Sequence, residues 1–257
     1  MSNYWATRNI VERENLLNHF IGATEKELVK QYRRSYAAIE KEMIGLYDEM
    51  RADSISDLYS FNRYYTMLNF IQERLTQLGI KEQSIFSKQF TDLYNRNADL
   101  IGSQIDFVIG LDEQAARKVI EKIWCADGLH WSDRIWKHKT ALVDRLEKGL
   151  IDCVSRGASH DEVVKQIQSD FTVGFAAADR VVRTELSYVQ NQSTLDKYKQ
   201  AGISKFQFLA EQGERTCGKC SELNGNQYDI GSAAVGVNMP PLHPNCRCTI
   251  LAVLEEE

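Results

Sequence analysis

Residues 24–50 have the sequence TEKELVKQYRRSYAAIEKEMIGLYDEM, and the spacing of their apolar side chains predicts the main element of the fold. Thr24 and Glu27 have the spacing of a capping box, which predicts that a helix begins there. Behind them, apolar residues recur at steps of four and three, as they do on one face of an amphipathic helix. The stripe consists of Tyr32, Tyr36, Ile39, Met43, Leu46 and Met50.

Two further stripes follow the first along the chain. Gly79 stands at the end of the second stripe, and because glycine is typical just beyond a helix, we expect the second helix to end there. Stripes that pack on one another predict an antiparallel helical hairpin or bundle, and an exposed coiled-coil arm for a partner is the alternative. The second stripe consists of Leu58, Phe61, Tyr65, Leu68, Ile71, Leu75 and Leu78, and the third of Phe86, Phe90, Leu93 and Leu100.

The distribution of proline supports a helical body. All three prolines of the chain lie at Pro240, Pro241 and Pro244. Proline disrupts helix interiors, so its absence from the preceding sequence favours helices. We therefore predict a mainly α fold, with long antiparallel helices over residues 1–110 and a compact α+β module with a small β element over residues 111–257.

Length and charge exclude several classes of protein. A chain of 257 residues can bury a substantial core, and its net charge of -5 argues against a generally basic protein that coats nucleic acid. No apolar run approaches the ~18 residues of a membrane-spanning helix, and the N-terminal sequence lacks the pattern of a signal peptide. We therefore expect no membrane association.

The pattern of the C-terminal module changes from helices to strands near residue 202. Residues 159–162 (SHDE) form another capping box, and a last long helix is expected from about Phe175 to just before Gly202. Residues 203–210 alternate between apolar and polar side chains, which predicts a strand. Residues 246–254 are rich in apolar and β-branched side chains and predict another.

Four of the six cysteines lie in this last part of the chain, and their spacing predicts a metal site. Cys217 and Cys220 form a C-x-x-C pair, whose thiolates can converge on one cation. A second group, His243, Cys246 and Cys248, follows after 22 intervening residues. Tetrahedral zinc takes four N or S ligands, so one of the five candidates either lies outside the coordination shell or binds in exchange with another. We predict a structural Zn2+, with a slight preference for Cys246 and Cys248 as the second pair because they alternate on the expected strand.

Other interpretations of these cysteines are disulfides, a redox pair and unligated core thiols. Disulfides need an oxidising compartment, which nothing in the sequence indicates, and a thioredoxin-like pair needs a βαβ setting. The motifs of zinc deaminases and zinc proteases are missing from the sequence, so we predict no catalytic residues. The remaining histidines and cysteines are expected to be surface or packing residues: His19, His130, His138, His160, Cys125 and Cys153.

These motifs in combination resemble those of the tailed-phage minor head proteins, or head-morphogenesis proteins, typified by the F protein of phage Mu. The resemblance covers roughly residues 115–252, and its most specific part is the cysteine region. It implies that Arg183 and Glu185 brace the last long helix against the cysteine module, with Arg215 and Arg247 belonging to the same motif. The motifs that carry the resemblance are Asp127-Gly128, Trp131 to Trp136, Arg183-Thr184-Glu185, Glu214 to Cys220 with Leu223 and Gly225, and Pro240 to Cys248.

The resemblance implies a structural and non-enzymatic function. Proteins of this family are minor components of the phage head, located inside it near the portal, which assist head assembly and genome packaging or ejection. The implied partners are the portal protein and the inner capsid or scaffold, with weak and non-specific contact to packaged DNA. Some members carry a toxin or ADP-ribosyltransferase domain after this module, and we expect none here, because the sequence ends shortly after its last strand.

Two other functions remain as alternatives. A nucleic-acid-binding zinc module would use Lys205, Arg215, Lys219 and Arg247, although acidic residues outnumber these positive charges after residue 201. A metal-dependent hydrolase would use Glu185 and His243 with the metal. A portal gene directly upstream would favour the structural function over both.

Overall fold

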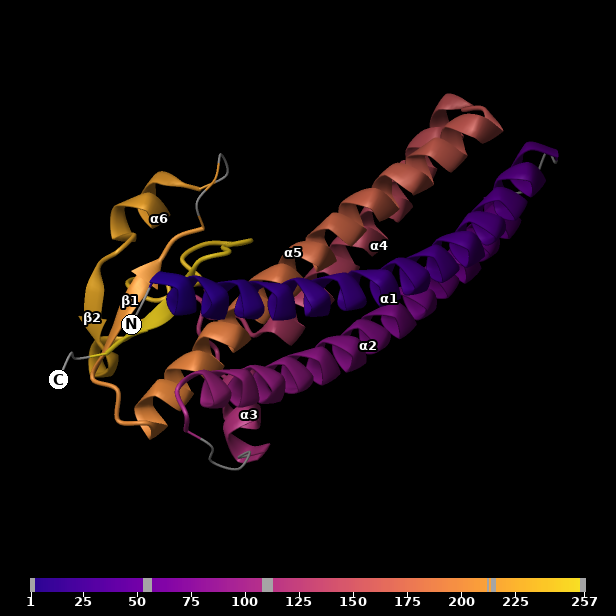
Figure 1. Ribbon diagram of the computed structural model, residues 1–257. Coiled ribbons are helices and arrows are strands. Elements are labelled where there is room, and N and C mark those ends of the chain that lie inside the picture. Colours follow the sequence, from indigo (N-terminus) through magenta and orange to yellow (C-terminus); the bar gives the residue numbers. More distant parts are fainter. Residues whose placement is uncertain (1–2, 53–56, 108–112, 212, 214–215, 255–257) are drawn as a thin grey trace. The chain divides into compact units, whose positions relative to one another are not determined.

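The computed structural model describes residues 3–52, 57–107, 113–211, 213 and 216–254 (Figure 1). Five α-helices precede a small sheet, which confirms the predicted mainly α class. The helices are α1 (Asn3–Ala52), α2 (Asp57–Gln104), α3 (Glu113–Ile120), α4 (Trp131–Arg156) and α5 (His160–Gln200). The remaining elements are β1 (Lys205–Leu209), α6 (Gly218–Leu223), β2 (Gln227–Asp229), the 3-10 turn η1 (Ile230–Ser232) and β3 (Thr249–Val253). No described helix combines the length and apolar character needed to cross a membrane.

The described residues form two compact units, to which α1, α2 and α5 each contribute. The sheet unit comprises Met1–Thr24, Phe86–Trp131 and Arg180–Glu257, and the bundle unit comprises Glu25–Ile85 and Ser132–Asp179. Compact units are groups of contacting residues and need not fold independently, so the predicted domain boundary near residue 110 stays a prediction.

The bundle unit has a core drawn from α1, α2, α4 and α5. Tyr32, Ile39, Met43 and Leu46 of the first predicted stripe are buried in it, and Tyr36 packs at its edge. For Met50, Leu58 and Phe61 of the predicted stripes, the structure describes the helical backbone and not the side chains. From α2, α4, α5 and the turn between α4 and α5, the core takes Met67, Ile71, Leu75, Leu78, Leu142, Leu146, Leu150, Cys153, Ala158, Val163, Ile167, Phe171 and Ala178.

Two predicted helix ends are wrong, because each residue has another role inside a continuous helix. Helix α1 runs through Thr24, whose hydroxyl donates to the carbonyl of Phe20 one turn earlier at 2.7 Å, so it does not cap a helix start. Helix α2 runs through Gly79, where an added Cβ would lie 2.8 Å from the ring of Trp136. Gly79 therefore permits a close helix contact in the bundle unit.

Helix α5 begins where the capping box predicts and is longer than expected. The backbone amide of Ser159 donates to Glu162 Oε2 at 2.7 Å, and the amide of Glu162 donates to Ser159 Oγ at 3.3 Å. The helix then continues through the break expected before Phe175. It ends before Gly202, whose φ of 72° is the left-handed conformation that glycine adopts readily.

The three strands form an antiparallel sheet in the order β2-β1-β3. The central strand β1 buries Phe206 and Phe208, as its alternating pattern predicts. The last strand begins at Thr249, later than predicted, so Cys246 and Cys248 precede it and do not alternate along it. Helix α6 and strand β2, which were not predicted, lie between β1 and the cysteine-rich segment of residues 243–248.

Candidate metal centre

The first cysteine pair is positioned by the start of α6. Cys217 is the N-cap residue of this helix, and its Sγ accepts from the backbone amide of Cys220 at 3.4 Å. The C-x-x-C pair therefore opens a helix, which the sequence analysis did not anticipate. The surrounding sheet is antiparallel, so these residues lack the βαβ setting of a thioredoxin-like redox pair.

The second group lies on the turn before β3, and α5 holds this turn from one side. The backbone amide of Asn245 donates to Thr184 Oγ1 on α5 at 3.0 Å, and Asn191 Nδ2 donates to the carbonyl of Cys248 at 3.2 Å. Asn245 has a φ of 60°, a left-handed conformation that asparagine tolerates better than most residues. Two polar side chains of a buried helix face thus fix the path of the cysteine-rich segment.

The five predicted ligands lie together in the sheet unit. Cys217, Cys220 and His243 offer donor atoms within 4.8 Å of one another, and so do Cys220, Cys246 and Cys248. Cys220 belongs to both groups: its Sγ lies 3.3 Å from His243 Nε2 and 4.0 Å from Cys246 Sγ. Such a cluster of thiols and imidazole could bind a metal ion.

The thiols of the cluster exchange hydrogen bonds, and their pKa values diverge. A hydrogen bond from the thiol of Cys248 lowers the pKa of Cys246 to about 5, while the same contact, together with burial, raises the pKa of Cys248. Burial raises the pKa of Cys220 to about 12. The side chains are thus arranged to stabilise one thiolate with neighbouring donors, and a cation at the same place would favour further deprotonation.

The imidazole of His243 is oriented by the turn that contains Pro240, Pro241 and Pro244, here called the proline turn. Its Nδ1 lies 2.8 Å from the carbonyl oxygen of Pro244, which can only accept a hydrogen bond, so the proton of the neutral ring belongs on Nδ1. Nε2 is then left with its lone pair toward Cys220. This arrangement, with one ring nitrogen bonded to a carbonyl and the other available, is typical of metal-binding histidines.

The predicted motif residues around the cluster have varied surroundings. Arg247 forms an ion pair with Glu211 at 3.2 Å, and the buried carboxylate of Glu185 accepts from Trp124 Nε1 at 2.8 Å. Burial and the nearby Arg247 lower the pKa of Arg183, which places these two guanidinium groups in the same region. Arg215 lies outside the described residues. That Arg183 and Glu185 brace the cysteine module stays a prediction.

The other two cysteines lie apart from the cluster. Cys153 is buried in the core of the bundle unit, as expected of a small apolar residue. Cys125 lies in the segment between α3 and α4, half-buried, and so does not occupy a helical stripe.

A helical chain that ends in a small antiparallel sheet thus carries a cluster of thiols and imidazole that could bind a metal ion. Residues 144–251 match the family model described as Phage Mu protein F like protein. The resemblance seen in the sequence is therefore confirmed over these residues, and this part of the chain is phage Mu F-like.

One curated relative adds a second comparison. Over 142 residues, the chain is 28% identical to the NAD(+)–arginine ADP-ribosyltransferase EFV of Enterococcus faecalis. The match covers 50% of this chain and 29% of that protein, so the chain spans less than a third of the length of this relative. No solved structure matches the chain.

Proposed function

We propose that this protein is a structural component of a tailed-phage head, located inside the head near the portal. The match of residues 144–251 to the phage Mu protein F-like family carries this proposal and supports a role in head morphogenesis. The proposed partners are the portal protein and the inner capsid or scaffold, and the proposed role is in head assembly and genome packaging or ejection. The function is proposed to be non-enzymatic, with only weak contact to packaged DNA through its phosphates.

The C-terminal module is proposed to be held together by one structural Zn2+. In tetrahedral zinc sites with bonds of ~2.0–2.3 Å, neighbouring ligand atoms lie roughly 3.5–3.8 Å apart. The distances from Cys220 Sγ to His243 Nε2 and to Cys246 Sγ, 3.3 and 4.0 Å, are close to these values. With the orientation of His243, they support Cys217, Cys220, His243 and Cys246 as ligands. Cys248, which the sequence favoured as a ligand, would then not bind the metal and would donate a hydrogen bond to the sulfur of Cys246.

The location in the head can be tested with purified particles. We expect the protein in DNA-filled heads, protected from added protease until the heads are opened, and missing from heads assembled without portal. Recovery of the protein only in the soluble fraction of a lysate that contains intact heads would contradict the proposal.

The metal can be tested by elemental analysis of protein purified without chelator. About one zinc per chain is expected, and Cys220→Ser should abolish it. Two further variants distinguish the set with His243 as the fourth ligand from the set with Cys248 in its place. His243→Gln removes a proposed ligand, and Cys248→Ser does not. Retention of zinc by His243→Gln and its loss in Cys248→Ser would show that the ligand set is wrong, and a Cys217–Cys220 disulfide in fresh particles would contradict the metal itself.

A further inference from the structure

A pocket of about 410 Å3 lies in the sheet unit and is lined by none of the five residues of the cysteine cluster. Its walls are formed by α3 with the turn that follows it and by the last turns of α5. The volume is within the range of roughly 300–1,000 Å3 that is usual for small-molecule sites. The proposed structural function does not use this pocket.

The pocket is lined by three exposed lysines and one acidic residue. Lys118, Lys122 and Lys199 make no salt bridge to any residue that the structure describes. The carboxylate oxygens of Asp196 accept from the hydroxyl of Tyr94 and from Gln192 Nε2, each at 3.0 Å. With three positive charges and one negative charge, the lining has a net charge of +2 in a protein whose net charge is -5.

A buried hydroxyl supplies a second and independent observation. Tyr188 forms part of the pocket wall and is only 1% exposed. Its ring stacks on the indole of Trp124, with centroids 4.8 Å apart and planes inclined by 12°, so the ring is fixed in place. Among the described residues, no hydrogen-bond partner exists for its hydroxyl. A buried hydroxyl without a partner is costly, and an acceptor on a ligand would remove that cost.

The hydroxyl of Tyr188 is a donor at any ordinary pH. Burial and the nearby carboxylates of Glu185 and Asp196 raise its pKa well above the usual value of tyrosine. The lysines and this hydroxyl are therefore all hydrogen-bond donors, and the lysines are positively charged as well. Such a set selects an anionic ligand that is rich in acceptor oxygens.

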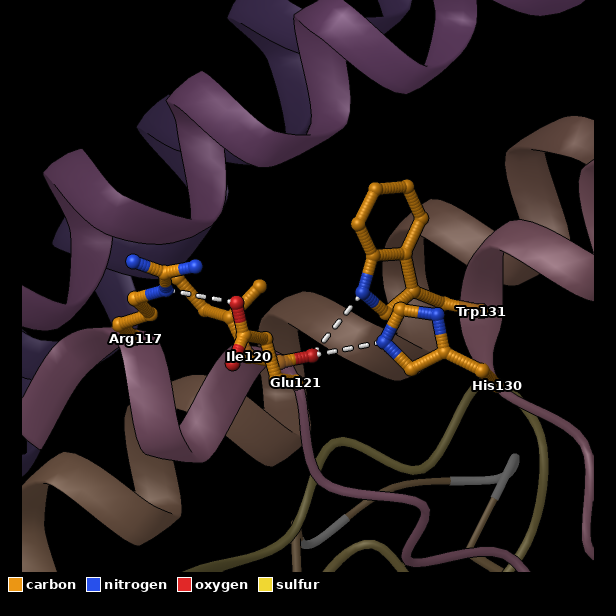
Figure 2. Close-up of polar contacts among 5 residues, drawn as sticks. All are labelled: Arg117, Ile120, Glu121, His130 and Trp131. Atoms are coloured by element: carbon orange, nitrogen blue, oxygen red, sulfur yellow. Dashed lines mark hydrogen bonds and ion pairs between the residues drawn. The ribbon is translucent and has the colours of Figure 1, made fainter.

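Helix α3, which carries Lys118 and is followed directly by the turn with Lys122, is held firmly at its C-terminal end. The carbonyl of Ile120, the last residue of α3, accepts from Trp131 Nε1 and lies within hydrogen-bonding distance of His130 Nε2, each at 3.0 Å (Figure 2). This carbonyl lacks a partner within its own helix, and the two rings satisfy it. Arg117 and Glu121 pair across one turn of the helix at 2.7 Å. The backbone that carries Lys118 and Lys122 is thus held in place without a ligand.

We propose that this pocket binds the phosphate group of a nucleotide or of a nucleic-acid strand. Phosphate oxygens would accept from Tyr188 and from the ammonium groups of Lys118, Lys122 and Lys199. The pocket is large enough for one nucleotide unit. Because the pocket and the metal cluster use different residues, failure of this proposal would leave the proposed head function untouched.

The test uses the full chain with two probes, thymidine monophosphate and a fluorescein-labelled single-stranded oligothymidine. In the double variant Lys118→Gln/Lys199→Gln, we expect affinity for the bound probe to fall about tenfold or more, and the salt dependence of oligonucleotide binding to decrease by roughly 1.4. The matched control is Lys41→Gln/Lys148→Gln, which makes the same change of net charge at two exposed helical lysines of the bundle unit. This control should bind as the parent protein does.

Each outcome decides a different part of the proposal. Saturable binding of the mononucleotide would identify a free nucleotide as the ligand, and binding of the oligonucleotide alone would identify a nucleic-acid strand. Tyr188→Phe should weaken binding about fivefold while leaving the salt dependence unchanged, and an unchanged affinity would remove the hydroxyl from the site. Equal losses in the lysine pair and its control, or no binding of either probe at low salt, would overturn the proposal.

Discussion

Substitution of Arg13 by methionine should destabilise the sheet unit. Arg13 lies on α1, is 1% exposed, and donates to the carbonyl of Ile250 at 2.5 Å. It also donates to Thr194 Oγ1 at 3.0 Å and to Thr249 Oγ1 at 2.5 Å. The side chain thus joins the beginning of the chain to its last strand, and burial lowers the pKa of its guanidinium group.

The pattern of the sheet explains why Ile250 needs this donor. The amide of Phe208 donates to Asn226 and its carbonyl accepts from Gly225, so both groups face away from β3. Phe208 and Ile250 are opposite each other and therefore form a non-hydrogen-bonded pair of the antiparallel ladder. The carbonyl of Ile250 accordingly points to the outer edge of β3, where Arg13 is its donor.

The loss of stability expected for Arg13→Met follows from the hydrogen bonds that methionine cannot make. Methionine roughly preserves the volume of the arginine stem and leaves the buried carbonyl of Ile250 without the donor it has now, which costs about 1–3 kcal/mol. Arg13→Ala adds a cavity and should cost about 3–5 kcal/mol in total. For a chain of this size, each kcal/mol lowers Tm by roughly 2–4 °C, so Arg13→Met should lower it by roughly 2–12 °C.

Calorimetry measures the change in Tm, and hydrogen exchange followed by mass spectrometry shows which part of the chain loses protection. Exchange should accelerate in β3 of Arg13→Met before it does in the bundle unit. Arg33→Met, at an exposed position of the same helix, is the control and should change stability by less than about 0.5 kcal/mol. If Arg13→Met is as stable as this control, or if β3 keeps its protection, the argument that Arg13 secures the sheet edge is refuted.

Three further predictions concern single contacts. Glu82 and Lys139 form a buried ion pair in the bundle unit, so Glu82→Gln or Lys139→Met should each cost about 3–5 kcal/mol, whereas Glu82→Leu/Lys139→Met should cost less than either in urea denaturation. Gly79→Ala should lower Tm because its methyl meets a rigid ring at 2.8 Å, whereas Gly45→Ala, with nothing within 4 Å, should raise it by the helix propensity of about 1 kcal/mol or less. Thr184→Val should weaken zinc retention against a competing chelator, because it leaves the proline turn without the acceptor that α5 supplies, and unchanged retention would contradict that coupling.

The helices were predictable wherever a buried stripe repeats, and their ends were not. Repetition places Tyr32 and Ile39 in the core, whichever residues begin and end the helix. Capping signals are local, and a helix that is packed along its length can continue through them. Thr24 and Gly79 both lie within such packed helices. Of the three, only Ser159 closely follows a residue that stops the preceding helix: Gly157, with a φ of 62°, lies two residues before it.

The short elements around the metal cluster were harder to predict for a different reason. Helix α6 has only six residues and a single buried side chain, Cys220, so it offers no repeat from which a period could be recognised. The strand β2 has three residues and buries none of them fully. Both are defined by their neighbours: β2 by its pairing with β1, and α6 by the cap that Cys217 provides. Contacts of this kind are invisible in a local sequence pattern.

The cysteine spacing predicted the cluster, whereas the contacts of Thr184 and Asn191 that position its second half were not predicted. Thr184 and Asn191 are seven residues apart, so they share one face of α5, two turns apart. The same face carries the buried residues Tyr188 and Leu195, and a threonine and an asparagine among them would be unfavourable without partners. Each finds its partner in the backbone of the cysteine-rich segment. Polar residues that interrupt a buried stripe are thus the sequence signal of such contacts. In this chain, they mark where α5 holds the segment that carries His243, Cys246 and Cys248.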